Sequence, residues 1–259
     1  MIIVRMVVGS DHRTCWNERF TGFSGHARSM PEVVTELYKV IEARGPDTVS
    51  FLQGQLTQDL RRLNTETRLF AAWCNPKGRV IVTIRLTAID DDVALVVPVN
   101  MVEYILEKMS LYRFRAKVEF IVTDRVARNI IEPDYDDHDK LIQAGIPYID
   151  VTNTESFTPH MLNLDKLDAI SFTKGCYTGQ EIVARTEHRG RTKRRLMRYE
   201  SDSSDVAAGA NVTNDDQVVG QVVNVSGHSL LAVTLVESHA TRLKVNETSI
   251  SPTGLPYSI

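Results

Sequence analysis

The segment KGCYTGQEIVAR, residues 174–185, places a cysteine between two glycines in a polar setting. A thiol acts as a nucleophile or a metal ligand only as the thiolate, and a nearby positive charge favours that anion. Lys174 stands two residues before Cys176 and could supply this charge. The alternative is a small buried side chain in a tight turn, which residue type alone favours, because free cysteine is among the most buried residue types. Both roles are open at this point.

An amide and a carboxylate, Gln180 and Glu181, follow the cysteine. A carboxylate accepts two parallel hydrogen bonds from a flat N–H and NH₂ edge, such as that of a pterin or a guanine. Glu181 also stands four residues before Arg185, the spacing of a helical ion pair. The two roles do not exclude each other. The basic run 185–198 could hold an anionic group, although such a run is more often a solvated strand face.

Two more groups of residues are candidates for a site. The turn Asn75-Pro76-Lys77-Gly78-Arg79 joins two apolar segments, and turns between strands often carry function. Gln53, Gln55 and Asp59 interrupt a leucine-rich segment and are either the polar lining of a site or plain surface. Neither group is specific enough to define a chemistry.

The elements that must position these residues follow from the apolar pattern. Leucines recur at helical spacing through 49–63 and predict one helix there. Gly54 weakens that helix by about 1 kcal/mol relative to Ala and indicates that something packs closely against it. Asn100 is predicted to cap a second helix, with Glu103 completing a capping box.

Strands are predicted on both sides of the second helix. The alternation in 80–87 predicts a strand with one core face. Valine-rich runs near the C-terminus, joined by Ser226-Gly227, predict a hairpin in a small β-domain that begins at about Arg194. The predicted strands are 69–74, 80–87, 93–99, 116–122, 217–225 and 229–236.

Composition restricts the function class. The 259 residues carry a net charge of -3, which argues against general nucleic-acid binding. The three cysteines, Cys15, Cys74 and Cys176, are far apart and form no CxxC pair, so we expect no metal site or disulfide framework and a reducing, cytoplasmic compartment. No apolar run approaches the roughly 20 residues of a membrane span, and we expect no secretion signal.

The segment 174–185, followed by HRGRTKRRL, resembles the signature of the YgfZ-type folate-binding proteins, whose mitochondrial counterparts serve iron-sulfur cluster maturation. The signature is long, which makes a chance match improbable. The resemblance covers most of residues 30–259. It extends to GPDTVSFLQGQLTQDL at 45–60, AAWCNPKGRVIVTIRL at 71–86, FTPHMLNLDKLDAISF at 157–172 and LPYS at 255–258.

The resemblance implies an α+β fold, because this family is related to the aminomethyltransferase of the glycine cleavage system. We expect an aminomethyltransferase-like folate-binding body at 30–193 and a C-terminal β-barrel at 194–259, with 1–29 unassigned. The body has a central hole in this family. A second lobe of the body is shortened here, near 122–140.

The resemblance also implies a ligand, partners and roles. The ligand is tetrahydrofolate or a derivative, and the partners are iron-sulfur client proteins, with nucleic acid not expected as a direct ligand. The implied role is assembly or repair of those clients, with an indirect effect on tRNA modification. The resemblance favours a functional Cys176. We expect catalytic roles for Cys176 and Lys174 and folate-binding roles for Tyr38, Gln53, Asp59, Asn75, Asn163, Gln180, Glu181 and Arg185. Tyr38 stands where bacterial members have a tryptophan implicated in folate contact.

Two other functions are open on the sequence. The first is a true tetrahydrofolate-dependent aminomethyltransferase, which requires a lipoyl carrier protein and against which the KGC signature argues. The second is a non-enzymatic RNA-binding module that uses the basic run 185–198. The overall acidity and the lack of aromatic residues among these cations argue against it.

Overall fold

The computed structural model describes residues 36–127, 130, 136–190, 192–238 and 241–259. Residues 36–259 form one compact unit. The unassigned segment 1–29 lies outside the described residues, as do residues 128–129 and 131–135 of the predicted short lobe near 122–140. No helix of the described residues is long and apolar enough to cross a membrane.

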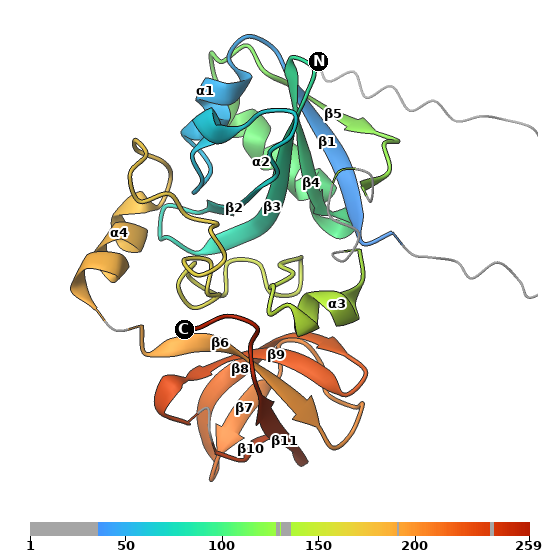
Figure 1. Ribbon diagram of the computed structural model, residues 1–259, viewed down its shortest axis with the longest axis vertical. Helices are drawn as coiled ribbons and strands as arrows, with labels where there is room; N and C mark the ends of the chain where they lie inside the picture. The colour runs from blue at the N-terminus through green and yellow to red at the C-terminus, as the bar shows by residue number, and fades with distance from the viewer. Residues whose placement is uncertain (1–35, 128–129, 131–135, 191, 239–240) are drawn as a thin grey trace, which may run out of the picture. The chain divides into compact units, whose positions relative to one another are not determined.

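A five-stranded antiparallel sheet forms the centre of the body, with the strand order β2-β3-β4-β1-β5. Strands β2, β3, β4 and β5 lie at the positions that the apolar runs predict. The sheet and the elements around it are visible in Figure 1. The bounds are β1 Tyr38–Arg44, β2 Leu69–Cys74, β3 Val80–Ile89, β4 Asp92–Pro98 and β5 Glu119–Thr123.

Both faces of this sheet are covered. Along β4, Val93 and Leu95 pack into one hydrophobic cluster, while Ala94 and Val96 pack into another on the opposite face. Strand β3 is buried along most of its length, including Thr83, so the predicted single core face is wrong. The alternating pattern predicts exposed threonines. Threonine, however, is small enough to be buried once its hydroxyl has a hydrogen-bond partner.

The leucine-rich segment does not form one helix, and that prediction is wrong. Helix α1 spans only Thr48–Gln53, and a 3-10 helix follows at Leu60–Arg62. Leu56 still reaches the same core from irregular backbone, where it pairs with Trp73 in an isolated bridge. The helical spacing of the leucines therefore reflects one common core rather than one continuous helix.

Helix α2, Val102–Arg113, covers one face of the sheet and buries Ile105 and Met109. The predicted cap is wrong, because the N-cap is Met101 and no side chain caps the helix. A short 3-10 helix precedes it, and Asn100 instead donates its amide hydrogen to Asp150 Oδ2 at 3.0 Å.

An irregular segment, 144–179, links helix α3, His138–Gln143, to helix α4, Gln180–Arg189. Its buried apolar side chains, among them Phe157 and Leu162, share one cluster with residues of the sheet and of the C-terminal strands. This cluster holds the body and the C-terminal domain together.

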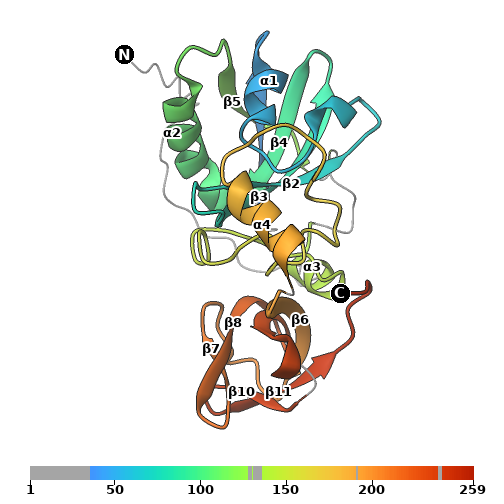
Figure 2. The ribbon, with the colours of Figure 1, turned by 90° about the vertical axis from the view of Figure 1, so that its left-hand side faces the viewer.

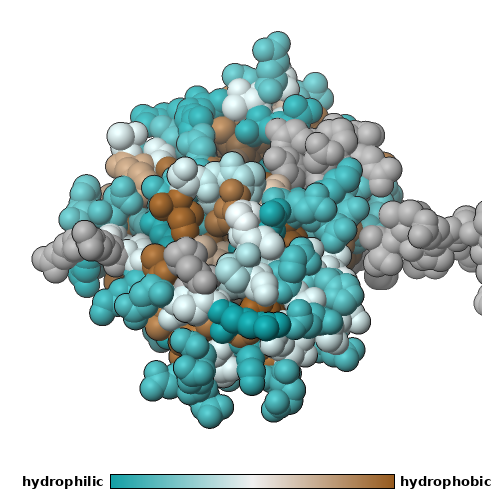
Figure 3. Space-filling model, turned by 60° about the horizontal axis from the view of Figure 1, so that its bottom comes forward, coloured by the Kyte–Doolittle hydropathy of each residue, from teal (hydrophilic) through white to brown (hydrophobic). Residues whose placement is uncertain are grey.

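Six strands close into a C-terminal barrel of order β10-β11-β6-β9-β8-β7, seen in Figure 2. The predicted hairpin is present as β8 and β9, with Gly227 of its turn at a φ of 55°. Hydrophilic side chains cover most of the surface seen from the barrel end (Figure 3). The bounds are β6 Arg194–Ser201, β7 Asn211–Asn214, β8 Gln217–Ser226, β9 Ser229–Leu235, β10 Leu243–Val245 and β11 Thr248–Thr253.

Candidate functional site

The turn 75–79 and the start of α4 are packed together through two glycines. Gly78 and Gly179 have φ values of 66° and 82°, in the region that favours glycine. A Cβ on Gly179 would lie 2.5 Å from the carbonyl oxygen of Asn75, and one on Gly78 would lie 2.7 Å from Cβ of Ile182. The structure therefore joins two motifs that the sequence singled out separately.

Lys174 points into the body, where its ammonium group meets backbone carbonyls. Nζ donates to the carbonyl oxygens of Gln53 at 2.7 Å, Leu56 at 2.7 Å and Gln58 at 2.9 Å. An ammonium has three N–H donors, so all of them are engaged. Burial lowers the pKa of Lys174 to about 8. The lysine thus holds the irregular backbone that follows α1.

Three further hydrogen bonds hold the backbone after α1, two of them to the irregular segment 144–179 and one to β2. Thr57 donates its hydroxyl to the carbonyl of Ala169 at 2.6 Å and accepts from the amide of Ala72 at 2.8 Å. The amide of Thr178 donates to the carbonyl of Gly54 at 3.2 Å. We call Gly54, Thr57, Lys174 and Thr178 the latch. It fixes both ends of the loop that carries the cysteine.

Cys176 itself is exposed, between the two latch residues of its loop. The interpretation of this cysteine as a small buried side chain is therefore wrong. A Cβ added to Gly175 would meet no atom within 4 Å, so this glycine lies in open space. By contrast Cys74 is buried, and burial raises the pKa of its thiol to about 12. Cys176 is thus the accessible thiol of the described chain.

Gln53 and Asp59 bond to each other and to their own segment. Gln53 Nε2 donates to Asp59 Oδ1 at 2.9 Å, and its Oε1 accepts from the amide of Leu60 at 2.8 Å. Hydrogen bonds from Arg61 hold the pKa of the Asp59 carboxyl far below its ordinary value. These contacts shape the 3-10 turn after the latch.

Residues of the basic run have separate tasks. Arg185 pairs with Glu181 on α4, as the spacing predicts, and both side chains are exposed. Gln180 is the first residue of α4, and its backbone N–H donates to the carbonyl oxygen of Tyr177 at 3.1 Å. Arg195 is largely buried and pairs with Asp165 at 2.6 Å. The expectation of a wholly solvated strand face is wrong for Arg195.

Two other expected folate ligands lie in packed surroundings. Tyr38 is buried and makes an edge contact with Tyr148 at 5.5 Å between ring centroids. Asn163 is fully buried and donates to the carbonyl of Leu196 at 2.8 Å and to the hydroxyl of Tyr257 at 3.3 Å. Asn163 therefore ties the irregular segment to the barrel.

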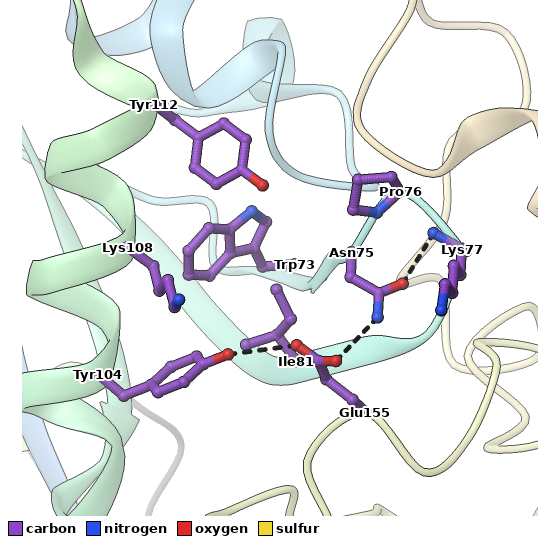
Figure 4. A pocket seen from close by; sticks show the side chains of 9 residues that line it. All are labelled: Trp73, Asn75, Pro76, Lys77, Ile81, Tyr104, Lys108, Tyr112 and Glu155. Atoms are coloured by element: carbon purple, nitrogen blue, oxygen red, sulfur yellow. Dashed lines mark hydrogen bonds between the residues drawn. The ribbon is translucent and has the colours of Figure 1, made fainter.

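A cavity of about 330 Å³ opens beside the turn 75–79, between β2, β3, α2 and the irregular segment. Figure 4 shows side chains that reach it from α2, among them Tyr104 and Lys108, and from the turn, among them Asn75 and Lys77. Of the residues expected to bind folate, Asn75 is the one that lines it. The lining residues are Trp73, Asn75, Pro76, Lys77, Ile81, Tyr104, Lys108, Tyr112 and Glu155.

Glu155 connects three walls of this cavity. Its Oε2 accepts from Asn75 Nδ2 at 3.0 Å, and its Oε1 accepts from the Tyr104 hydroxyl at 3.2 Å (Figure 4). Burial raises the pKa of Tyr104, and the negative charge of Glu155 adds to that rise. The backbone of Glu155 has a φ of 57°, a costly conformation for a residue with a side chain. Such strain is concentrated at functional sites.

Trp73 supplies the cavity with a buried donor. Its side chain is fully buried, and its indole Nε1–H has no hydrogen-bond partner in the described structure. An unsatisfied buried donor costs about 1–3 kcal/mol, which a ligand acceptor would recover. The Tyr112 ring makes an edge contact with the indole at 6.0 Å, and Lys108 Nζ lies 5.6 Å from the centre of the Tyr104 ring.

The sequence predictions missed Trp73, Tyr104, Lys108 and Glu155. Tyr104, Lys108 and Tyr112 recur at a spacing of four residues on α2, so their shared face could have been found. Nothing in the sequence indicated the backbone conformation of Glu155. No group of residues in the described structure could hold a metal ion.

Comparisons with known proteins agree with the signature. No family model matches the chain. An uncharacterized protein of Haemophilus influenzae is 28% identical over 269 residues, covering 86% of this chain and 96% of that protein. The tRNA-modifying protein YgfZ of an Enterobacter species is 25% identical over 291 residues, covering 83% and 89%. That of Hamiltonella defensa is 29% identical over 221 residues, covering 61% and 66%.

A solved structure gives the fold. The crystal structure of the glycine cleavage system aminomethyltransferase T from Bartonella henselae matches with a TM-score of 0.62 and 13% identity, covering 85% of this chain and 84% of that one. The α+β fold with an aminomethyltransferase-like body and a C-terminal β-barrel is confirmed. At this identity the likeness concerns the fold alone.

Proposed function

We propose that this homologue of the YgfZ-type proteins binds a reduced folate, tetrahydrofolate or a derivative, and serves the assembly or repair of iron-sulfur proteins. Any effect on tRNA modification would then be indirect, through a client enzyme. The name of its relatives, tRNA-modifying protein, supports that link. We also propose a reducing, cytoplasmic compartment, which suits the free thiols Cys74 and Cys176.

The chemistry of the cavity wall is the observation that carries the proposal. A folate joins a flat hydrogen-bonding pterin to an aromatic ring and an anionic glutamate tail. The cavity offers aromatic rings, an orphaned buried indole N–H on Trp73, a carboxylate on Glu155 and ammonium groups on Lys77 and Lys108. Its volume of about 330 Å³ lies in the range of ligand pockets, roughly 300–1,000 Å³. The residues present fit the ligand.

Each lining residue has a role in this proposal. Glu155 would accept hydrogen bonds from the pterin amino edge, because it presents two oxygens and is held by Asn75 and Tyr104. Trp73 would donate its free indole hydrogen to a ring acceptor. Lys108 would pair with a carboxylate of the tail. A bound folate supplies the carrier for a one-carbon unit.

Cys176 has a different task. It is exposed and does not line the cavity. We assign it to the encounter with a client protein or with a sulfur or iron species. Lys174, expected to be catalytic, has its donors engaged by three carbonyls, and we assign it to holding the cysteine loop.

A cellular assay tests the combined function. In cells that lack the protein, the wild-type chain restores the activity of client iron-sulfur enzymes. Cys176→Ala and Glu155→Gln each reduce that activity at least tenfold, at equal protein levels. Cys74→Ala serves as the control thiol if it folds. Normal client activity with Cys176→Ala would overturn the role of the thiol.

A further inference from the structure

An exposed apolar tip lies where α2 ends. The side chains of Leu111 and Phe114 are 69% and 86% exposed. This tip, residues 111–117, is joined to the start of α1 by two hydrogen bonds. The backbone N–H of Lys117 donates to Asp47 Oδ2 at 2.8 Å, and the carbonyl oxygen of Lys117 accepts from the backbone N–H of Asp47 at 3.5 Å. Figures 1 and 2 both show α1 and the turn between α2 and β5 at the same end of the sheet. Val49 of α1 adds a third exposed apolar side chain.

The backbone of Phe114 is strained. Its φ is 38° and its ψ is −87°, a combination outside the regions that residues with side chains normally adopt. The ring gains little packing in return, because its contact is the guanidinium of Arg115, 5.4 Å from its centre. Strain that packing does not offset points to a function for the exposed ring.

Three cationic residues flank Phe114 in the chain, and Arg115 contacts its ring. Arg113, Arg115 and Lys117 form no ion pair within the described part of the chain. Arg113 donates one hydrogen to the carbonyl of Val118 at 2.8 Å. An open hollow of about 460 Å³ runs beneath Phe114 and is lined by Arg44, Arg113, Lys117 and Glu119, among others. The tip therefore combines protruding apolar groups with an excess of positive charge.

We propose that this tip, residues 111–117, docks a client protein whose surface offers an apolar pocket ringed by carboxylates. The proposal rests on the proposed function, since it names the surface through which the iron-sulfur client is held. Aromatic and arginine side chains dominate the binding energy of protein interfaces. The positive rim calls for a negative partner.

RNA and an anionic lipid surface are the competing partners, and the test includes both. The exposed ring of Phe114 could stack on one base, whereas the aliphatic Leu111 and Val49 offer no flat face for others. The carboxylates of Asp47 and Glu119 lie beside the cations, so the tip carries both signs of charge. A protein surface can carry both signs of charge and an apolar pocket, so it complements all of these groups.

Cells that lack the protein provide the test, complemented with wild type, Phe114→Gly, the double variant Arg115→Glu with Lys117→Glu, or the control Val218→Gly. Val218 is an exposed valine of the barrel. We expect both tip variants to lower client enzyme activity at least tenfold, and the control to match wild type. Phe114→Gly also relieves the strained backbone, so its melting temperature is expected to be no lower than that of wild type.

Calorimetry with tetrahydrofolate separates the two proposals. The tip variants are expected to bind tetrahydrofolate as wild type does while client activity falls. Wild-type client activity in both tip variants overturns the docking surface. Micromolar binding of a labelled single-stranded RNA or of phosphatidylglycerol vesicles, lost in the same variants, overturns the protein partner. If the wild-type chain binds no tetrahydrofolate but the tip variants still lose client activity, the docking surface is supported and only the folate site is contradicted.

Discussion

Single residues in this protein adopt conformations that only their surroundings explain. Glu155 and Phe114 both have positive φ values, and neither is a glycine. Glu155 is stabilised by hydrogen bonds to Asn75 and Tyr104, which places the strain inside the cavity wall. Phe114 has no comparable support. We interpret the first as part of a binding site and the second as part of a docking surface.

Gly179→Ala tests the contact between the signature and the turn. Gly179 and Gly209 have nearly equal φ values, 82° and 83°, but only Gly179 has backbone atoms where a Cβ would lie. Gly209→Ala should therefore cost only the conformational strain, about 1–2 kcal/mol of unfolding free energy. Gly179→Ala should cost clearly more, because Asn75 must also move. Equal losses in denaturant unfolding would show that the two motifs are not in contact.

Asp59 predicts a pH dependence of stability. Its folded pKa lies far below the unfolded value, through hydrogen bonds from Arg61. The stabilisation is therefore present above about pH 4, the unfolded pKa, and is lost as the pH falls toward the folded pKa. The difference in unfolding free energy between wild type and Asp59→Asn should be constant from pH 7 to 5 and shrink below pH 4. A difference that is unchanged at pH 3 contradicts this assignment.

At the scale of elements, the latch explains why the leucine-rich segment and the signature occur together. The carbonyls after α1 find their donors on Lys174 and Thr178 rather than on a continuing helix. The irregular backbone costs conformational freedom, and three charge-assisted hydrogen bonds offset that cost. The exposed Cys176 is thus carried on a loop that is fixed at both ends.

Lys174→Met tests the latch. It leaves three buried carbonyls without a donor, so the segments 53–58 and 171–178 should lose protection from hydrogen exchange together, by at least tenfold. The barrel should keep its protection. Lys174→Arg is the matched control that retains the charge, and methylammonium added to Lys174→Ala should restore part of the protection. Loss of protection in only one of the two segments would show that the latch does not couple them.

At the scale of the whole molecule, the sequence predicted the parts whose form depends on local pattern. Strands β2, β3, β4 and β5, the β8–β9 hairpin and the pair Glu181–Arg185 follow from apolar runs, turn residues and helical spacing. The resemblance of the signature predicted the aminomethyltransferase-like fold. The periodicity of apolar residues alone does not predict it.

The failures have a common physical cause, which is tertiary contact. The leucines of 49–63 share a core without sharing a helix, because Lys174 donates hydrogen bonds to backbone carbonyls of this segment. Asn100 bonds to Asp150 instead of capping α2. The cavity residues come from four separated elements and meet only after folding. The positions of Asn163 and Tyr38 in the packed interior were likewise invisible in one sequence.

The most direct test of the account is an anaerobic calorimetric titration of the purified chain with tetrahydrofolate. We expect binding in the micromolar range. Glu155→Gln and Lys108→Ala should each weaken it at least tenfold, and Cys176→Ala should leave it unchanged, because the thiol lies outside the cavity. No binding by the wild-type chain, or equal binding by Glu155→Gln, would contradict the assignment of the cavity to a folate.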